Sequence, residues 1–425
     1  MLQVSFIKAH KEEVINGLRK RNYSDDALIV IDQIIAIDDD RKKHQQALDA
    51  LKAAKNKLSD DIGMLFKQGN VAEANDLKSQ VANLKTEEEK LEQLGKIAAD
   101  ELEQLLLSVP NIPNATVPFG KTPEDNEVYK AWAQALPAFD ESALPHWELA
   151  KKYNLIDFEL GVKITGSGFP LYRGKGAKLQ RALIAFFLDE AIAAGYEEIL
   201  PPLMVNADSA RATGQLPDKE GQMYFMEKDN LYMIPTAEVP VTNIYRDVIL
   251  SENELPIKLT GYTPCFRREA GSYGAHVRGL NRVHQFDKVE IVQITHPEQS
   301  YNTLYQMLQH VSSLMDKLEL PYRILRLCGG DMGFTSALTF DFEVYAAAQQ
   351  RWLEVSSVSN FETYQANRLK CRFKDPTGKI QLAHTLNGSA LALARIVAAL
   401  LENNQTTSGI NLPKVLHAYT GFERI

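Results

Sequence analysis

Heptad spacing of apolar residues over a stretch without proline constrains the fold of this chain more than any other feature of its sequence. The first hundred residues contain no proline, and two apolar series flank Gly69. Each series fits an amphipathic helix, and glycine favours the end of the first. The heptad positions are Val30, Ile34, Ile37, Leu48, Leu51, Leu58, Ile62 and Leu65 in the first helix and Ala74, Leu77, Val81, Leu84, Leu91, Ala98, Leu102 and Leu105 in the second. The pattern predicts an antiparallel helical hairpin over about residues 27–106.

The predicted hairpin is too long to be wrapped by the rest of the chain. At about 1.5 Å per residue, about 35 residues of helix extend for about 50 Å. We therefore expect the hairpin to project as an arm. Taken alone, such an arm also fits a dimerising or purely structural coiled coil, so its function depends on the sequence that follows.

A proline-rich segment separates the helical region from a region of mixed character. Pro110, Pro113, Pro118 and Pro123 interrupt any helix there. We expect an N-terminal domain at 1–107, a linker at 108–126 and a second domain at 127–425. In the second domain, helical patterns occupy 176–195, 297–318 and 389–403, and strand patterns occupy 258–267, 282–294, 322–328, 340–345 and 352–356. Because few helices separate consecutive strands, the expected class is α+β, with a mostly antiparallel sheet flanked by helices.

Composition excludes several classes of protein. Hydrophobic residues at 45% and charged residues at 24% are typical of a globular chain. The three cysteines are far apart in the sequence and predict neither a disulfide framework nor a thiolate zinc site. No apolar run approaches the roughly 18 residues that cross a bilayer, and the charged N-terminus differs from a secretory signal, so we expect a cytoplasmic protein without membrane association. With a net charge of −8, any surface for nucleic acid has to be local.

A strand, a glycine-rich loop and a second strand carry the candidate chemistry. Arg267 and Glu269 stand at alternate positions of the expected first strand, so they would present a phosphate-binding fork and a hydrogen-bond acceptor on one side. On the return strand, Arg282, Phe286 and Glu290 would share a face. The loop between them contains Gly271, Gly274, His276, Arg278 and Gly279. This arrangement suits a purine nucleotide, although a surface hairpin with ordinary ion pairs also fits these residues taken alone.

The segment FRREAGSYG at 266–274, followed by VRGLNRVHQFDKVE at 277–290, resembles motif 2 of the class II aminoacyl-tRNA synthetases in the form found in seryl-tRNA synthetases. Further segments agree in order: TAE at 236–238, EVSS at 354–357 with SNF at 359–361, and TLNGS at 385–389 with an arginine at 395. The resemblance covers the whole chain, including the hairpin. The HIGH and KMSKS signatures of the other synthetase class are absent from the sequence.

This resemblance implies an enzyme, a serine–tRNA ligase. It would activate L-serine with ATP to seryl adenylate and transfer serine to tRNA(Ser), with tRNA(Sec) as a second candidate acceptor. The segment at Pro201 and Pro202 resembles motif 1, here at the start of an expected strand, and implies a homodimer. The arm would bind the long variable arm of the tRNA by its shape, with phosphate contacts. Candidate lysines are Lys52, Lys55, Lys57, Lys78, Lys85 and Lys90.

For ATP, the resemblance implies a role for each matching residue. Arg267 would bind the α-phosphate, Glu269 the adenine amino group and Arg282 the γ-phosphate. Phe286 and Arg395 would stack on the two faces of adenine. Arg267, Glu269, Arg282 and Arg395 are thus the candidate catalytic residues. The full candidate ATP site comprises Arg267, Arg268, Glu269, Arg282, Val283, Phe286, Glu354, Val355, Ser356, Ser357 and Arg395.

The resemblance also implies a serine pocket and a metal site. Glu290 would pair with the ammonium group of serine, and Glu238 would bind its hydroxyl, so alanine would leave a buried polar group unpaired. Glu354 and Ser357 would hold Mg²⁺, which prefers oxygen ligands. The candidate serine site comprises Thr236, Ala237, Glu238, Arg267, Glu290, Asn387 and Ser389.

Some positions depart from the family pattern. Arg268 stands where serine is common, and Ala390 and Ala394 stand where glycine is usual at one or both positions. We expect no change of reaction from them. Two alternative functions stay open: a synthetase-like ligase that loads an amino acid on a carrier protein, which would lack the hairpin, and a non-catalytic synthetase paralogue, which would lack Arg267, Glu354 or Arg395.

Overall fold

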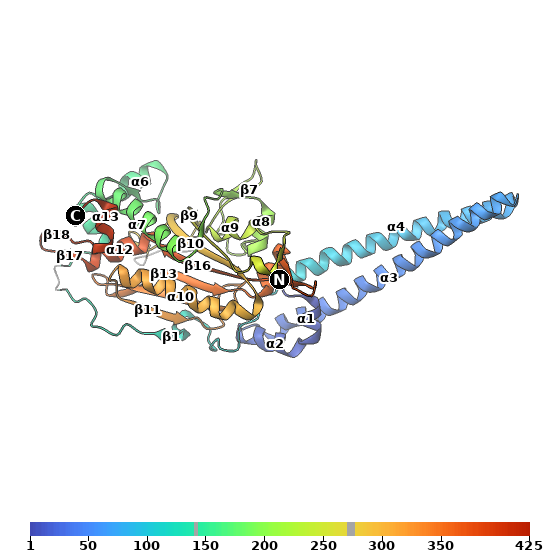
Figure 1. Ribbon diagram of the computed structural model, residues 1–425, viewed down its shortest axis with the longest axis horizontal. Coiled ribbons are helices and arrows are strands. Elements are labelled where there is room, and N and C mark those ends of the chain that lie inside the picture. Colours follow the sequence, from blue (N-terminus) through green and yellow to red (C-terminus); the bar gives the residue numbers. More distant parts are fainter. Residues whose placement is uncertain (140–142, 270–276) are drawn as a thin grey trace. The chain divides into compact units, whose positions relative to one another are not determined.

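The computed structural model describes residues 1–139, 143–269 and 277–425. The chain forms two compact units (Figure 1). One comprises Met1–Arg19 and Tyr23–Pro110, and the other comprises Lys20–Asn22 and Asn111–Ile425. We call them the helical unit and the sheet unit.

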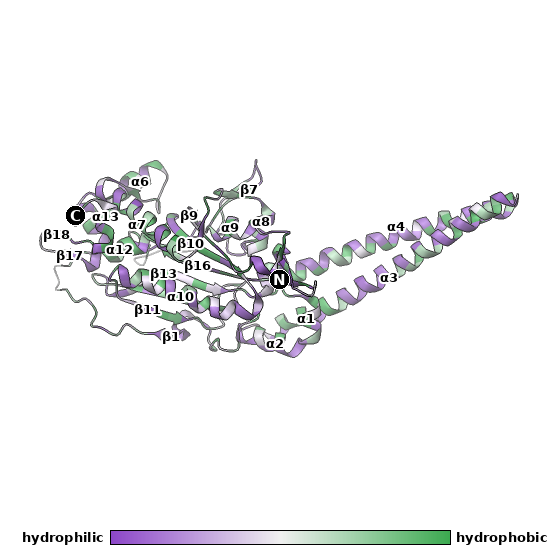
Figure 2. Cartoon of the chain, viewed as in Figure 1, coloured by the Kyte–Doolittle hydropathy of each residue, from purple (hydrophilic) through white to green (hydrophobic). Residues whose placement is uncertain are grey.

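The helical unit contains α1 (Val4–Ala9), all of α2 (Lys11–Lys20) except its last residue, α3 (Asp25–Lys67) and α4 (Val71–Ser108). The side chain of Ser24 accepts a hydrogen bond from the Ala27 amide and caps α3. Between the long helices Gly69 adopts φ +82°, a conformation that favours glycine. The helices α3 and α4 pack along each other, and Figure 2 shows hydrophobic and hydrophilic residues alternating along both. The predicted helical hairpin is confirmed.

Apolar contacts and ion pairs both hold the hairpin together. Near its base Ile31, Ile34 and Leu102 are buried, whereas most seam residues farther along are only partly buried. There Lys52 pairs with Glu92 at 2.9 Å, and Lys55 pairs with Glu88. These two lysines, candidates for phosphate contacts, therefore already bridge the two helices.

A buried carboxylate joins α1 to α3. Asp38 is 2% exposed and lies 2.7 Å from Lys8 Nζ, 2.9 Å from an Arg41 guanidinium nitrogen and 2.9 Å from Lys42 Nζ. Although burial opposes it, hydrogen bonding to these three cations holds the pKa of Asp38 well below its ordinary value. An ionised Asp38 therefore stabilises the base of the hairpin.

An eight-stranded sheet is the centre of the sheet unit. Its strand order is β1-β11-β12-β13-β16-β10-β9-β4, and every neighbouring pair is antiparallel except β4 with β9. The strands are β1 (Glu127–Lys130), β4 (Glu197–Glu198), β9 (Ile257–Phe266), β10 (Gln285–Thr295), β11 (Tyr322–Arg326), β12 (Leu338–Ala346), β13 (Arg351–Asn360) and β16 (His384–Ala392). This arrangement confirms the expected α+β class.

Helices cover the sheet and bury its apolar side chains. Three long helices, α7 (Gly174–Ala193), α10 (Ser300–Lys317) and α12 (Leu393–Asn403), pack on its central strands. Phe186, Phe187, Phe340 and Phe342 are fully buried in the shared core. No helix among the described residues has the length and apolar content to span a bilayer.

Short elements complete the sheet unit. The helices are α5 (His146–Lys152), α6 (Phe158–Ile164), α8 (Ala207–Thr213), α9 (Glu238–Asn243), α11 (Thr363–Leu369) and α13 (His417–Thr420). The strands are β2 (Ile156–Asp157), β3 (Leu171–Tyr172), β5 (Met204–Val205), β6 (Phe225–Met226), β7 (Leu231–Met233), β8 (Ile249–Ser251), β14 (Arg372–Lys374), β15 (Ile380–Leu382), β17 (Gln405–Thr406) and β18 (Gly409–Ile410).

Three local predictions are wrong. The helix expected from residue 389 begins at Leu393, because Ser389 and Ala392 pair with β10 in the sheet. Arg267 and Glu269 lie beyond β9, and Glu269 has φ +49°, so they are not alternate positions of one strand. The return strand begins at Gln285, which leaves residues 282–284 outside it. In each case ladder pairing sets a boundary that side-chain pattern alone does not.

Candidate active site

The sheet order brings most of the candidate residues onto adjacent strands. β10 lies between β9 and β16, and β16 also pairs with β13. Glu290 is directly opposite Ser389, and Val292 is opposite Asn387. Residues almost a hundred positions apart in the sequence therefore become neighbours.

Glu290 is the centre of a buried polar pocket. Its carboxylate accepts hydrogen bonds from Thr236 Oγ1 at 3.2 Å and Asn387 Nδ2 at 3.0 Å. Lys288 Nζ lies 2.9 Å from Glu290 Oε2, and the two side chains are 7% and 1% exposed. Three of the predicted serine-site residues are thus in direct contact.

Lys288 is a part of this pocket that the sequence prediction omits. Two residues before Glu290 on the same strand, it points to the same side of the sheet. This alternation was the available signal, because a lysine and a glutamate on one face of a strand are placed to pair. A buried ion pair is costly unless further hydrogen bonds support it, and here Thr236 and Asn387 both donate to the Glu290 carboxylate.

Glu238 is a second buried carboxylate near the pocket. Its Oε1 accepts a hydrogen bond from Gln365 Nε2 at 2.7 Å, and its backbone amide donates to Thr236 Oγ1 at 3.3 Å. Burial, and then the nearby Glu290 carboxylate, raise the pKa of Glu238 to about 7. Gln365, which also accepts from Thr385 Oγ1 at 2.8 Å, was absent from the predicted site. Because it lies on α11, no strand pattern points to it.

The candidate ATP-binding arginines already have protein partners. The guanidinium of Arg267 lies 5.3 Å from the ring centre of Phe286, a cation–π distance, and its Nε contacts the Pro235 carbonyl at 3.4 Å. Arg282 forms an ion pair with Glu269. Arg268 is placed by its backbone amide, which donates to the Gln222 carbonyl at 2.9 Å.

Arg395 connects three of the predicted segments. Its Nε donates to the Asn281 carbonyl at 2.9 Å, and its NH1 donates to the Glu354 carbonyl at 2.7 Å. The start of α12 is thereby joined both to the segment before β10 and to β13. Residues 271, 274 and 276 of the predicted loop lie outside the described residues.

Several predicted residues contribute mainly to packing. Val283, Val355 and Ala237 are buried in apolar clusters. Ser356 is also buried, and its hydroxyl donates to the Ser389 carbonyl at 2.6 Å. These side chains support the strands that carry the polar groups.

The predicted metal ligands Glu354 and Ser357 lie on β13, beside Asp341 of β12. Asp341 is directly opposite Ser357, and their side chains are hydrogen-bonded. Burial, together with the Glu354 carboxylate, raises the pKa of Asp341 well above its ordinary value. Among the described residues no group of three His, Cys, Asp or Glu side chains has the arrangement of a metal site. The oxygen donors nevertheless fit Mg²⁺, which commonly takes one or two carboxylates and completes its shell with water and substrate phosphates.

The fold and the site define a class II aminoacyl-tRNA synthetase. An antiparallel sheet carries an arginine at the end of one strand, a motif 2 segment, and an arginine at the start of the helix that follows another strand. The family model described as "tRNA synthetase class II core domain (G, H, P, S and T)" matches residues 224–404. The model of the seryl-tRNA synthetase N-terminal domain matches residues 1–113. The chain belongs to the seryl-tRNA synthetase family.

Full-length relatives agree with this assignment. A protein of Salinibacter ruber named Serine--tRNA ligase is 50% identical over 427 residues, covering 100% of this chain and 99% of the relative. One of Chlorobaculum parvum with the same name is 45% identical over 434 residues and is covered completely. The crystal structure of seryl-tRNA synthetase from Pyrococcus horikoshii complexed with ATP has a TM-score of 0.89 at 32% identity, with 100% of this chain and 99% of that chain covered.

Proposed function

We propose that this chain is a serine–tRNA ligase that activates L-serine with ATP to seryl adenylate and then transfers serine to tRNA(Ser). The observation that carries the proposal is the buried pocket around Glu290, with Arg267 nearby, in a chain of the seryl-tRNA synthetase family. The pocket provides carboxylates for an ammonium group and a hydroxyl. The arginine provides a fixed positive charge.

In the adenylation step the serine carboxylate attacks the α-phosphate and pyrophosphate leaves. No side-chain nucleophile is needed, so catalysis depends on placing the reactants and stabilising the charge that develops. Arg267 neutralises the α-phosphate, and Arg282 meets the γ-phosphate. Arg282 and Glu269 form an ion pair with each other. Since Arg282 is assigned to the γ-phosphate and Glu269 to the adenine amino group, we expect ATP to separate this pair as it binds.

The serine pocket explains how the amino acid would be selected. Glu290 pairs with the ammonium group beside Thr236, Asn387 and Ser389, and Glu238 accepts from the hydroxyl. Alanine has no hydroxyl, so it would leave Glu238 without this partner in a buried site. In comparable pockets, the loss of such a hydrogen bond lowers kcat/KM for the analogue by about 10⁴-fold. Threonine has to be excluded by the size of the pocket.

Glu354 and Ser357 would hold Mg²⁺ at the phosphates of ATP. The ion would offset the negative charge of the triphosphate, while the chain's own residues orient ATP. Arg395 fixes the position of Glu354 through its bond to the Glu354 carbonyl. Phe286 and Arg395 would stack on adenine, and the guanidinium of Arg267 lies 5.3 Å from the centre of the same Phe286 ring.

Further parts of the proposal concern assembly and acceptor. A homodimer is supported by the exposed side chains of Leu200, Leu203 and Met204, which follow α7 in the motif 1 region and are 86%, 36% and 51% exposed. The helical unit would bind the long variable arm of tRNA(Ser), and tRNA(Sec) is a second acceptor to test. We place the enzyme in the cytoplasm. The two alternative functions lose their premises, because the hairpin, Arg267, Glu354 and Arg395 are all present.

Amino-acid-dependent exchange of pyrophosphate into ATP tests the proposal. With Mg²⁺ and without tRNA, serine should support exchange while alanine, glycine and threonine should not. Charging of tRNA(Ser) and tRNA(Sec) transcripts then tests the transfer step. Folded protein that shows no exchange with serine would contradict the proposed function, and a molar mass of one chain in light scattering would contradict the homodimer.

A further inference from the structure

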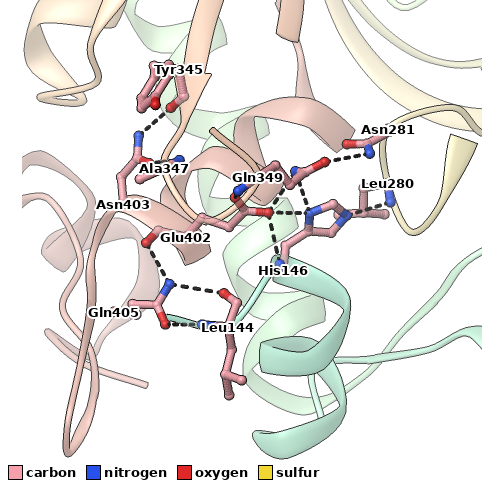
Figure 3. Close-up of polar contacts among 10 residues, drawn as sticks. All are labelled: Leu144, His146, Leu280, Asn281, Tyr345, Ala347, Gln349, Glu402, Asn403 and Gln405. Atoms are coloured by element: carbon pink, nitrogen blue, oxygen red, sulfur yellow. Dashed lines mark hydrogen bonds and ion pairs between the residues drawn. The ribbon is translucent and has the colours of Figure 1, made fainter. Parts of the chain in front are cut away.

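A histidine and a glutamate that are far from the predicted site in the sequence form a fully buried pair (Figure 3). His146, the first residue of α5, and Glu402, near the end of α12, have side chains that are both 0% exposed. Glu402 Oε1 accepts from the His146 backbone amide at 2.9 Å and contacts His146 Nδ1 at 2.8 Å. Gln405 holds the segment before α5 through two hydrogen bonds with the backbone of Leu144.

The other ring nitrogen of His146 reaches the segment that precedes β10. Nε2 accepts a hydrogen bond from the Leu280 backbone amide at 2.8 Å. Because an amide can only donate, Nε2 carries no proton, and Nδ1 therefore donates to Glu402. The bond to Glu402 thus selects the tautomer of His146 that can hold Leu280.

The first turn of α5 also contacts the two residues before Leu280. A Cβ at Gly279 would lie 2.3 Å from His146 Nε2, so only glycine allows this approach, and its φ of +69° favours glycine as well. The guanidinium of Arg278 lies 4.8 Å from the ring centre of Trp147, and one of its nitrogens is 3.2 Å from Glu148 Oε1. Three consecutive residues are therefore held by one helical turn.

Gln349, in the turn between β12 and β13, extends the network to Arg395. Its Nε2 donates to Glu402 Oε1 at 2.7 Å, and its Oε1 accepts from Asn281 Nδ2 at 2.8 Å. The Asn281 carbonyl in turn accepts from Arg395 Nε at 2.9 Å. The buried pair is thus connected through Asn281 to both Arg282 and Arg395, which the proposed function assigns to ATP.

We propose that His146 is a positioning residue for ATP. With Glu402 and Gln349, it fixes the backbone of residues 278–281 so that Arg282 and Arg395 face the nucleotide. The serine pocket around Glu290 receives no hydrogen bond from this network among the described residues. The inference rests on the proposed function, since it concerns the ATP half of the same site.

Two substitutions at one position separate the two hydrogen bonds of the ring. The amide of asparagine occupies the place of Nδ1, so His146→Asn can keep the bond to Glu402 but loses the acceptor for Leu280. The amide of glutamine reaches the place of Nε2, so His146→Gln can keep the acceptor for Leu280. We expect His146→Asn to raise the KM for ATP in serine-dependent pyrophosphate exchange about tenfold, with the KM for serine changed less than about twofold. His146→Gln should recover most of the loss.

Controls separate positioning from general destabilisation. His384→Asn removes another histidine ring, whose Nδ1 lies 2.8 Å from Ser300 Oγ, and should leave the KM for ATP unchanged. Gln349→Ala breaks the bridge to Asn281 at a partly buried position and should raise the KM for ATP selectively. It also tests the inference if His146→Asn does not fold.

The inference is overturned if the KM values for ATP and serine rise together, or if a folded His146→Asn or Gln349→Ala variant keeps the wild-type KM for ATP. Failure of the proposed function looks different, because the wild-type chain itself would then show no serine-dependent exchange. In that case the affinity of each variant for ATP, measured by calorimetry against the wild type, still decides whether the network positions the nucleotide.

Discussion

Replacing Lys288 by methionine tests the electrostatics of the pocket. The substitution keeps a long apolar stem but removes the cation 2.9 Å from Glu290 Oε2. Glu290 is 1% exposed, so water cannot replace the lost partner. Removing one member of a buried ion pair typically costs about 3–5 kcal/mol. Because Thr236 and Asn387 still donate to the Glu290 carboxylate, we expect the low end, about 3 kcal/mol.

Thermal unfolding followed by circular dichroism measures this cost. At about 2 °C per kcal/mol for a large unit, Lys288→Met should lower the Tm by about 6 °C. The double variant Lys288→Met with Glu290→Gln removes both charges and should recover most of the loss. Lys317→Met removes the cation of the more exposed Lys317–Glu190 pair and should change the free energy of unfolding by less than about 1 kcal/mol. A double variant as unstable as the single one would refute the electrostatic reasoning.

Four further predictions follow from single contacts and from the two units. Burial raises the pKa of Glu238 from 4.5 to about 7, so its contribution to stability is full below pH 4.5 and is lost as the pH rises through about 7. The Tm of the wild type should therefore fall relative to that of Glu238→Gln between pH 5 and pH 8. Parallel curves of Tm against pH would contradict this. Asp38→Asn should destabilise the helical unit by about 2 kcal/mol at pH 7 in urea unfolding; since the pKa of Asp38 is lowered from 3.8, the difference from wild type should shrink as the pH falls below about 4. Arg267→Ala should slow serine-dependent pyrophosphate exchange by about 10²–10³-fold without lowering the Tm. Deletion of residues 28–105 should spare exchange and reduce tRNA charging at least about tenfold. Equal loss of both steps on deletion would mean that the arm is needed for folding.

The predictable parts of the fold are those with a local period. Heptad spacing from Val30 to Leu65 and from Ala74 to Leu105, with the glycine at 69 between them, is enough to predict α3, α4 and the turn, because side chains three and four apart share one helix face. Alternation likewise indicates β9, β10, β12 and β13. Boundaries are less predictable, since Ser389 could continue a helix or pair with Glu290, and only the neighbouring strand decides.

The candidate site divides in a similar way. Motif resemblance identifies Arg267, Glu290 and Arg395, which lie within recognisable strings of residues. It does not identify Gln365, Asp341 or His146, because their partners are distant in the sequence. Gln365 is 127 positions from Glu238, Asp341 is 16 positions from Ser357, and His146 is 256 positions from Glu402. Lys288 is an intermediate case, since its position two residues before Glu290 was a usable signal.

The sequence by itself determines the helical hairpin, the α+β class and the family, because periodicity and ordered motifs are properties of neighbouring residues. Tertiary structure alone decides which charges are buried together. Glu290 is ionisable in any conformation, but only the pairing of β10 with β16 surrounds it with Asn387 and excludes water. His146 has no visible role in the sequence, and only the approach of α12 and of the segment before β10 to α5 gives its ring a carboxylate partner and a backbone amide to hold.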